Sequence, residues 1–116
     1  MDDMYEIQAD VLKALSNPRR LEIIHWLAQE PCDVGTLADR MAVAQPNVSQ
    51  HLALMRSTGM VEGERHGREV RYRLTDPDIV AACALMRGVI ERRVARLADA
   101  AARREPITTT VNTTPR

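Results

Sequence analysis

The stretch AQPNVSQHLALMRSTG, residues 44–59, decides the fold. Pro46 falls in the first turn of the helix expected here, where its missing N–H costs nothing. Gly59 suits the left-handed position that follows a helix C-terminus. The apolar residues between them recur at helical spacing on one face: Val48, Leu52 and Met55, with Leu54 beside them. The stretch therefore predicts one amphipathic helix with defined ends.

The opposite face of this helix carries hydrogen-bonding side chains and no acid: Gln45, Asn47, Ser49, Gln50 and His51. DNA base edges in the major groove offer donors and acceptors to side chains of this kind. The pattern therefore indicates a recognition helix, and the DNA-facing set that we expect also includes Pro46 and Arg56.

Length and composition set limits on the rest. A chain of 116 residues is one domain with a modest core, and with no Phe, one Trp and two Tyr its packing is aliphatic, which favours helices. The formal net charge is zero, but residues 44–75 carry three acids against five bases, whereas residues 1–43 carry eight against four. The middle segment is therefore where phosphates would be met.

Several classes of protein do not fit. No apolar run approaches the roughly 20 residues that span a bilayer, and the acidic start does not resemble a signal peptide, so we expect a cytoplasmic protein without a membrane partner. In that reducing compartment Cys32 and Cys83 are expected as free thiols. The sequence has no Gly-rich phosphate loop, no nucleophile–base constellation and no paired acids, so we do not expect an enzyme.

Helices are expected before the quoted stretch as well. The first covers residues 2–15, and the second covers residues 18–30 with Asn17 as its cap. A third, over residues 34–42 with Asp33 as its cap, is followed after a tight turn by the quoted helix. Two short helices joined in this way predict a helix-turn-helix. The alternative is an ordinary pair of amphipathic helices in a bundle.

Residues 60–74, MVEGERHGREVRYRL, change from helical to alternating periodicity, with His66-Gly67 suited to a tight turn. Basic side chains occupy the tip and outward face: Arg65, His66, Arg68, Arg71 and Arg73. A hairpin of this kind directly after a helix-turn-helix predicts a wing that contacts phosphates or the minor groove. The alternative is a solvated face that Glu62, Glu64 and Glu69 partly neutralise.

A long final helix is expected over residues 75–102, capped by Asp76 and begun by Pro77. Its apolar stripe has heptad-like spacing: Ile79, Cys83, Met86, Ile90, Val94 and Leu97. A small domain has little core left to cover this stripe, so we expect a homodimer built on this helix with Ile7 and Val11 of the first. The alternative is an intramolecular packing face.

The whole pattern predicts a mainly α fold with a small β-hairpin, a winged helix-turn-helix of five helices and a two-stranded wing. We expect residues 1–102 to form the DNA-binding and dimerisation domain and residues 103–116, rich in Thr and Pro, to form a disordered tail. The expected partner is double-stranded operator DNA with an imperfect inverted repeat. A protein-interaction module that dimerises without touching DNA is the competing hypothesis.

From Val11 to Leu74 the chain resembles the ArsR/SmtB family of bacterial winged-helix repressors. ALSNPRRLEIIHWLA resembles the family's second-helix signature, and QPNVSQHLALMRSTGMVEGERHGREVRYRL is similar to its recognition helix and wing, including S-x-H-L and G-[LM]-V. The resemblance implies a dimeric repressor that leaves its operator when an inducer binds or a thiol is modified. Ala44 departs from the pattern, since many members carry Ser there. Loss of that N-cap oxygen lowers the stability of the helix end by about 1 kcal/mol.

The two metal layouts of the family can be compared with this sequence. The first uses C-x-C-D at the start of the third helix, where the corresponding Glu30-Pro31-Cys32-Asp33 lacks one thiol. The second uses Asp and His pairs on the last helix, and no His follows His66. No obvious four-ligand zinc set results, and no resident cofactor is expected.

The cysteines leave three hypotheses open. The N-terminus of the third helix can stabilise a Cys32 thiolate, whereas Cys83 lies on the apolar stripe. The two residues could form a dithiol switch for oxidant or persulfide, or bind a thiophilic ion such as arsenite or cadmium with help from the other subunit. They could also be small buried hydrophobes, one or both, with a small molecule as inducer. We favour thiol-based sensing.

Overall fold

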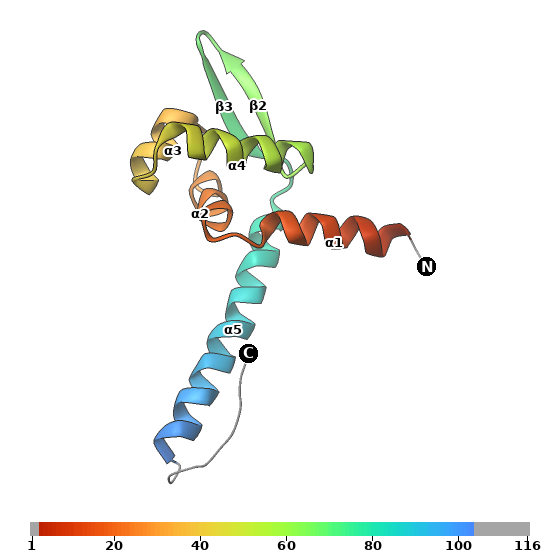
Figure 1. Cartoon of the computed structure of the whole chain (residues 1–116), viewed down its shortest axis with the longest axis vertical. Coiled ribbons are helices and arrows are strands. Elements are labelled where there is room, and N and C mark those ends of the chain that lie inside the picture. The colour runs from red at the N-terminus through yellow and green to blue at the C-terminus, as the bar shows by residue number, and fades with distance from the viewer. Residues whose placement is uncertain (1–2, 104–116) are drawn as a thin grey trace. The chain divides into compact units, whose positions relative to one another are not determined.

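The computed structural model describes residues 3–103. Its elements, in chain order, are α1 (Asp3–Leu15), α2 (Pro18–Leu27), β1 (Cys32–Asp33), α3 (Val34–Met41), α4 (Gln45–Ser57), β2 (Val61–His66), β3 (Glu69–Leu74) and α5 (Asp78–Arg103) (Figure 1). The predicted helices and hairpin are therefore confirmed. The chain divides into two compact units, one ending at Ala81 and the next beginning at Ala82, and each is described by itself. Residues 104–116, in the predicted tail, lie outside the described part.

The core lies where α2, α3 and α4 meet. The buried apolar side chains of these helices are Ile23, Ile24, Leu27, Leu37, Ala38, Met41, Val48, Leu52 and Met55. The predicted inner face of α4 is confirmed by this set. Helical spacing in α2 predicts that Leu21, Ile24 and Leu27 face inward. This prediction is partly wrong, because Leu21 is 46% exposed while Ile23 is fully buried. Packing against α3 and α4 selects which side of a weakly amphipathic helix turns inward.

The helix ends follow the predicted chemistry. The side chain of Asn17 accepts from the N–H groups of Arg19 and Arg20, and Asp33 Oδ1 accepts from Thr36 N at 2.7 Å. Asp76 Oδ1 accepts from Asp78 N at 2.9 Å, so Asp76 lies just outside the final helix, which begins at Asp78 rather than Thr75.

The end of α4 is a Schellman motif. Met60 N donates to Met55 O at 2.9 Å and Gly59 N donates to Arg56 O at 3.0 Å. Gly59 has φ +80°, the left-handed conformation predicted for it. This tight stop directs the chain from α4 straight into β2.

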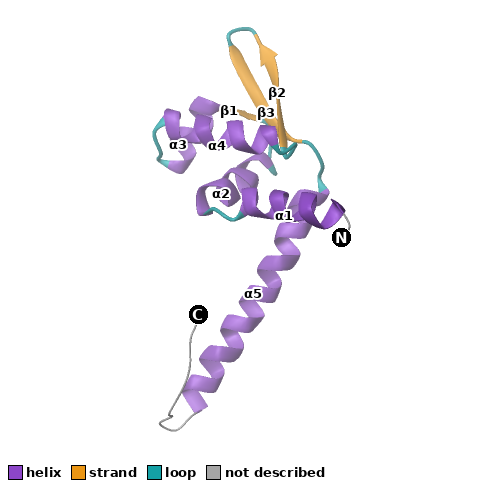
Figure 2. Cartoon of the chain, turned by 45° about the vertical axis from the view of Figure 1, so that its right-hand side comes forward, coloured by secondary structure: helices purple, strands orange, loops and turns teal. Residues whose placement is uncertain are grey.

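The sheet has three strands in the order β1-β3-β2, all antiparallel, and β1 lies beside β3 (Figure 2). The predicted two-stranded wing was therefore incomplete, because a strand of two residues is too short to show alternation. The turn was also misplaced by one residue. His66 pairs with Glu69, so Gly67 and Arg68 form the turn, and Gly67 takes the first position because its φ of +65° suits glycine.

Helix α5, taken by itself, is 26 residues long and has no buried residue. The predicted stripe is largely open: Met86, Ile90, Val94 and Leu97 are each 50–59% exposed. Ile7 of α1 is 55% exposed. None of the helices within residues 3–103 is both long and apolar enough to cross a membrane.

Candidate nucleic-acid interface

The polar face of α4 is in solvent, as the sequence predicted. Five of the six residues expected at its N-terminal half are exposed: Gln45, Pro46, Asn47, Ser49 and Gln50. The turn that positions this helix passes through Ala42, whose φ of 56° is left-handed. Ala44, at the N-cap, makes no side-chain cap hydrogen bond, which confirms the missing cap.

His51, the sixth, is placed differently. Its ring is half-buried, and its Nδ1 lies 3.3 Å from Nη1 of Arg20 on α2. Burial lowers the pKa of His51 below its ordinary value of 6.5, and the charges of Arg20 and Arg19 lower it further. His51 is therefore a neutral side chain on the flank of α4 at neutral pH.

The register of the hairpin divides the predicted wing arginines between two faces. Residues directly opposite each other in an antiparallel pair share a face. Arg71 lies opposite Glu64 on β2 and Asp33 on β1, and Arg73 forms an ion pair with Glu62. That face is electrically compensated.

The other wing cations have different surroundings. His66 Nε2 lies 3.3 Å from Glu64 Oε1, so it too has an acidic neighbour. Arg65 lies opposite Val70, on the face away from these acids, and Arg68 lies in the turn. Neither Arg65 nor Arg68 has a carboxylate partner within residues 3–103. These two are the freest of the predicted wing contacts.

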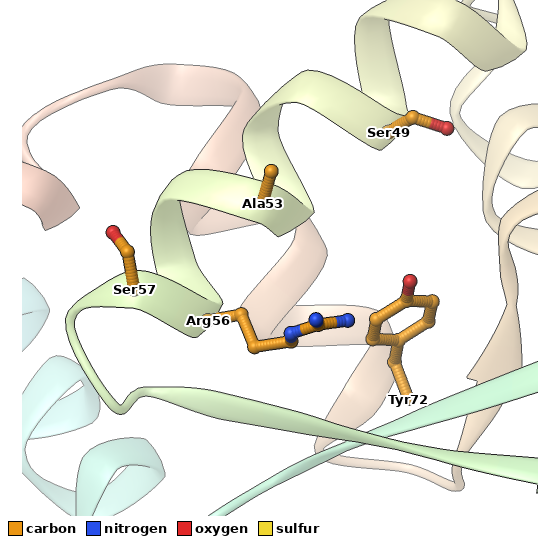
Figure 3. Close-up of a pocket in the computed structure, with 5 residues that line it drawn as sticks. All are labelled: Ser49, Ala53, Arg56, Ser57 and Tyr72. Carbon is orange, nitrogen blue, oxygen red and sulfur yellow. The ribbon is translucent and has the colours of Figure 1, made fainter.

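A hollow of about 330 Å³ lies between α4 and the hairpin. It is lined by Ser49, Ala53, Arg56, Ser57 and Tyr72. Figure 3 shows the guanidinium of Arg56 extending toward the ring of Tyr72. Ser57 Oγ donates to Leu54 O at 2.7 Å. In the described part of the chain, the side chains of Ser49, Arg56 and Tyr72 have no hydrogen-bond partner.

Tyr72 was not among the residues that the sequence singled out for DNA contact. Its position depends on Gly63, which lies opposite it on β2. A Cβ at residue 63 would lie 2.8 Å from Val70 Cγ1 and 3.1 Å from Tyr72 Cε1. The glycine therefore leaves room for the ring. A glycine opposite an aromatic residue is visible in the sequence only once the register is known.

Cys32 does not have the environment that the sequence suggested. It is 4% exposed, its Sγ donates to Glu30 O at 3.4 Å, and Arg40 Nη1 lies 3.7 Å from the sulfur. Burial raises the pKa of the Cys32 thiol; Arg40 opposes this, and Glu30 and Asp33 add to it. The expectation of a stabilised thiolate was therefore wrong for this state, because desolvation outweighs the nearby positive charge.

The other cysteine predicted to take part in sensing, Cys83, is half-buried on α5. It belongs to the unit that begins at Ala82, whereas Cys32 belongs to the first unit. Within residues 3–103, no group of three or more His, Cys, Asp or Glu side chains could hold a metal ion.

A helix-turn-helix followed by a β-hairpin, which β1 extends to a three-stranded sheet, defines a winged helix-turn-helix protein. The chain belongs to the ArsR family of bacterial regulatory proteins, a family of transcriptional regulators rather than enzymes. Residues 17–63 match the model of this family. The match covers the helix-turn-helix and the start of the wing.

Two relatives from Mycobacterium tuberculosis illustrate the similarity. The transcriptional repressor SmtB is 42% identical over 74 residues, which are 64% of this chain and 55% of that protein. This chain thus spans about half the length of SmtB. The uncharacterized regulator Rv0081 is 32% identical over 103 residues, covering 84% of this chain and 90% of that protein.

Solved structures agree with the fold. The crystal structure of Rv0081 aligns with a TM-score of 0.76 over 84% of this chain and 99% of that one, at 28% identity. The solution structure of the homodimeric winged helix-turn-helix domain of Mb0332 from Mycobacterium bovis aligns with a TM-score of 0.74 at 31% identity, covering 81% of this chain and 87% of that one.

Proposed function

We propose that this protein is a homodimeric transcriptional repressor that binds a specific double-stranded operator in the cytoplasm. The observation that carries the proposal is the hollow between α4 and the wing, where the side chains of Ser49, Arg56 and Tyr72 have no partner within the described residues. Such a set suits a phosphodiester oxygen. The hollow borders the exposed polar face of α4. A backbone phosphate bound in the hollow would therefore bring the edges of the neighbouring base pairs close to that face.

The division of labour follows from the geometry. The exposed amides of α4 would contact base edges in the major groove: Gln45, Asn47 and Gln50. The hydroxyl of Ser49, which lines the hollow, would contact the phosphate. Arg65 and Arg68, which lack carboxylate partners in the part of the chain described, would contact phosphates or the adjacent minor groove. Arg71, placed opposite Asp33 and Glu64, contributes less.

Dimerisation is supported by the open apolar stripe of α5 and by the exposed apolar residues of α1, Ile7 among them. A second copy of the chain would cover both. The Mb0332 domain, similar in fold, is described as homodimeric. A twofold dimer presents two recognition helices, so we propose an imperfect inverted repeat with half-sites about 34–36 Å apart. A repressor of this kind acts by occupying a promoter.

We propose that thiol chemistry at Cys32 releases the operator. Support comes from the register, in which Cys32 is the direct partner of Tyr72 on β3, and Tyr72 lines the hollow. An oxidant or persulfide that modifies the sulfur adds volume at a fully packed site and displaces this row of the sheet. Because the reduced thiol is buried with a raised pKa, reaction requires local opening of β1, which has two residues.

The alternatives to this signal are a thiophilic ion, such as arsenite or cadmium bound by Cys32 and Cys83 with a ligand from the second subunit, and a small molecule with no thiol role. Fluorescence anisotropy on a duplex from the protein's own promoter separates them. Reduced, persulfide-treated and oxidised protein are compared with reduced protein in arsenite or cadmium. A Cys32→Ser variant that still loses DNA under every treatment would refute the role of Cys32.

The DNA-binding proposal has its own test. Gln50→Ala and Asn47→Ala should each weaken specific binding by about 1–3 kcal/mol. Light scattering should show an unchanged dimer. A matched control is Gln29→Ala, which removes an amide from the loop after α2 instead of from α4. Equal operator affinity for all three variants and the wild type would refute the recognition-helix assignment and favour a protein-interaction module.

A further inference from the structure

We infer that Arg20 fixes the tautomer of His51, so that the recognition helix presents a ring Nε2–H donor to an acceptor atom of DNA. The ligand in this inference rests on the proposed function, whereas the tautomer does not. Arg20 is thereby a positioning residue on α2, outside the helix-turn-helix itself. No DNA contact is assigned to it.

The guanidinium of Arg20 is held from two sides. Its Nε donates to the carbonyl oxygen of Ala14, which belongs to the last turn of α1 and lacks an intrahelical partner. Its Nη1 lies 3.3 Å from Nδ1 of His51 on α4. One planar group therefore joins the end of α1 to the flank of the recognition helix. Because the guanidinium is rigid, the first bond fixes the direction of the second.

The chemistry of the two groups determines the proton position. An arginine side chain has five N–H donors and no acceptor, so Nδ1 of His51 must accept. A neutral imidazole carries a single ring proton, which then resides on Nε2. A protonated ring would instead direct an Nδ1–H at the guanidinium. Burial and the charges of Arg20 and Arg19 oppose that state.

This assignment restricts what His51 can contact. An Nε2–H donates to a phosphate oxygen, to purine N7, to guanine O6 or to thymine O4, and it cannot accept from the exocyclic amines of cytosine or adenine. Asn47 and Gln50 differ in this respect, because an amide offers both donors and an acceptor. Unlike these amides, His51 therefore acts only as a donor.

The tautomer is tested on the free protein by long-range ¹H–¹⁵N NMR, which distinguishes protonated from unprotonated ring nitrogens. We expect the Nε2–H form to dominate in the wild type at about pH 8, above the ordinary imidazole pKa. Arg20→Met should give a mixture, and Arg20→Lys, which keeps a donor, should restore part of the preference. The matched control is Arg19→Met, which removes a charge but no contact to the ring.

A dominant Nδ1–H form in the wild type would overturn the inference whether or not the variants fold. An unchanged spectrum in a folded Arg20→Met variant would overturn the role of Arg20.

The acceptor is identified on DNA by scanning operator duplexes that carry one neutral methylphosphonate or one 7-deazapurine. At the position that His51 contacts, the substitution should weaken wild-type binding about two- to tenfold and leave His51→Ala unaffected. A methylphosphonate effect identifies a phosphate, and a 7-deazapurine effect identifies a base edge. If the wild type binds the operator and no substitution is coupled to His51, the acceptor assignment is wrong. If it binds no DNA at all, the proposed function fails, while the NMR result still decides the tautomer.

Discussion

Replacing Arg56 by glutamine tests whether the hollow between α4 and the wing binds a DNA phosphate. The side chain of Arg56 lines the hollow and has no carboxylate partner within residues 3–103, so its charge is free to neutralise a phosphate. Each phosphate neutralised contributes about 0.9 to the slope of log K against log salt. A dimer carries Arg56 twice, so the slope should decrease by about 1.8. Between about 50 and about 200 mM salt, the variant should lose about twelvefold less affinity than the wild type.

The assay is fluorescence anisotropy on one operator duplex at several salt concentrations. Arg73→Gln is the matched control, because it removes the same charge from the wing. Arg73 differs from Arg56 in having a carboxylate partner, since its Nε donates to Glu62 Oε2 at 2.7 Å. Its slope should change by less than half as much. Weaker binding of Arg56→Gln should extend to unrelated sequences, since phosphates carry no base identity. Equal slopes for Arg56→Gln and the wild type, or a larger change for Arg73→Gln, would refute the proposal that the hollow binds a phosphate.

Three further outcomes are expected. Cys32 should be alkylated far more slowly in the native protein than in urea at about pH 8, because burial and a raised pKa suppress its thiolate. Alkylation is followed by mass spectrometry, and comparable rates in the two states would contradict this prediction. Ala44→Ser supplies the missing N-cap oxygen of α4 and should raise the free energy of unfolding by about 1 kcal/mol in urea titrations, whereas no gain would show that the cap position is already satisfied. The lowered pKa of His51 means that the unfolded chain binds more protons, so stability should be constant above about pH 6.5 and decrease as the pH falls through the folded pKa. His51→Gln should weaken that decrease, and an identical pH profile for the two proteins would exclude His51 as its source.

Local patterns in the sequence were sufficient for most of the fold. Caps and breakers are interactions among neighbouring residues, so Asn17, Asp33 and Gly59 marked helix ends that the structure confirms. The exposed face of α4 followed from periodicity alone. A strand of two residues is too short to repeat the alternating pattern, which is why β1 was missed.

The sequence by itself determined which residue types are available for contact with DNA and which helix presents them, because amphipathicity is a property of residues a few positions apart. Tertiary structure decided how those residues are partnered. Strand register placed Arg71 among carboxylates and Tyr72 beside the hollow, and helix packing turned His51 toward Arg20 and buried Cys32. Each of these depends on pairs of residues far apart in the chain. Hydrogen bonding, desolvation and charge compensation act through space, so they were fixed only when the chain folded.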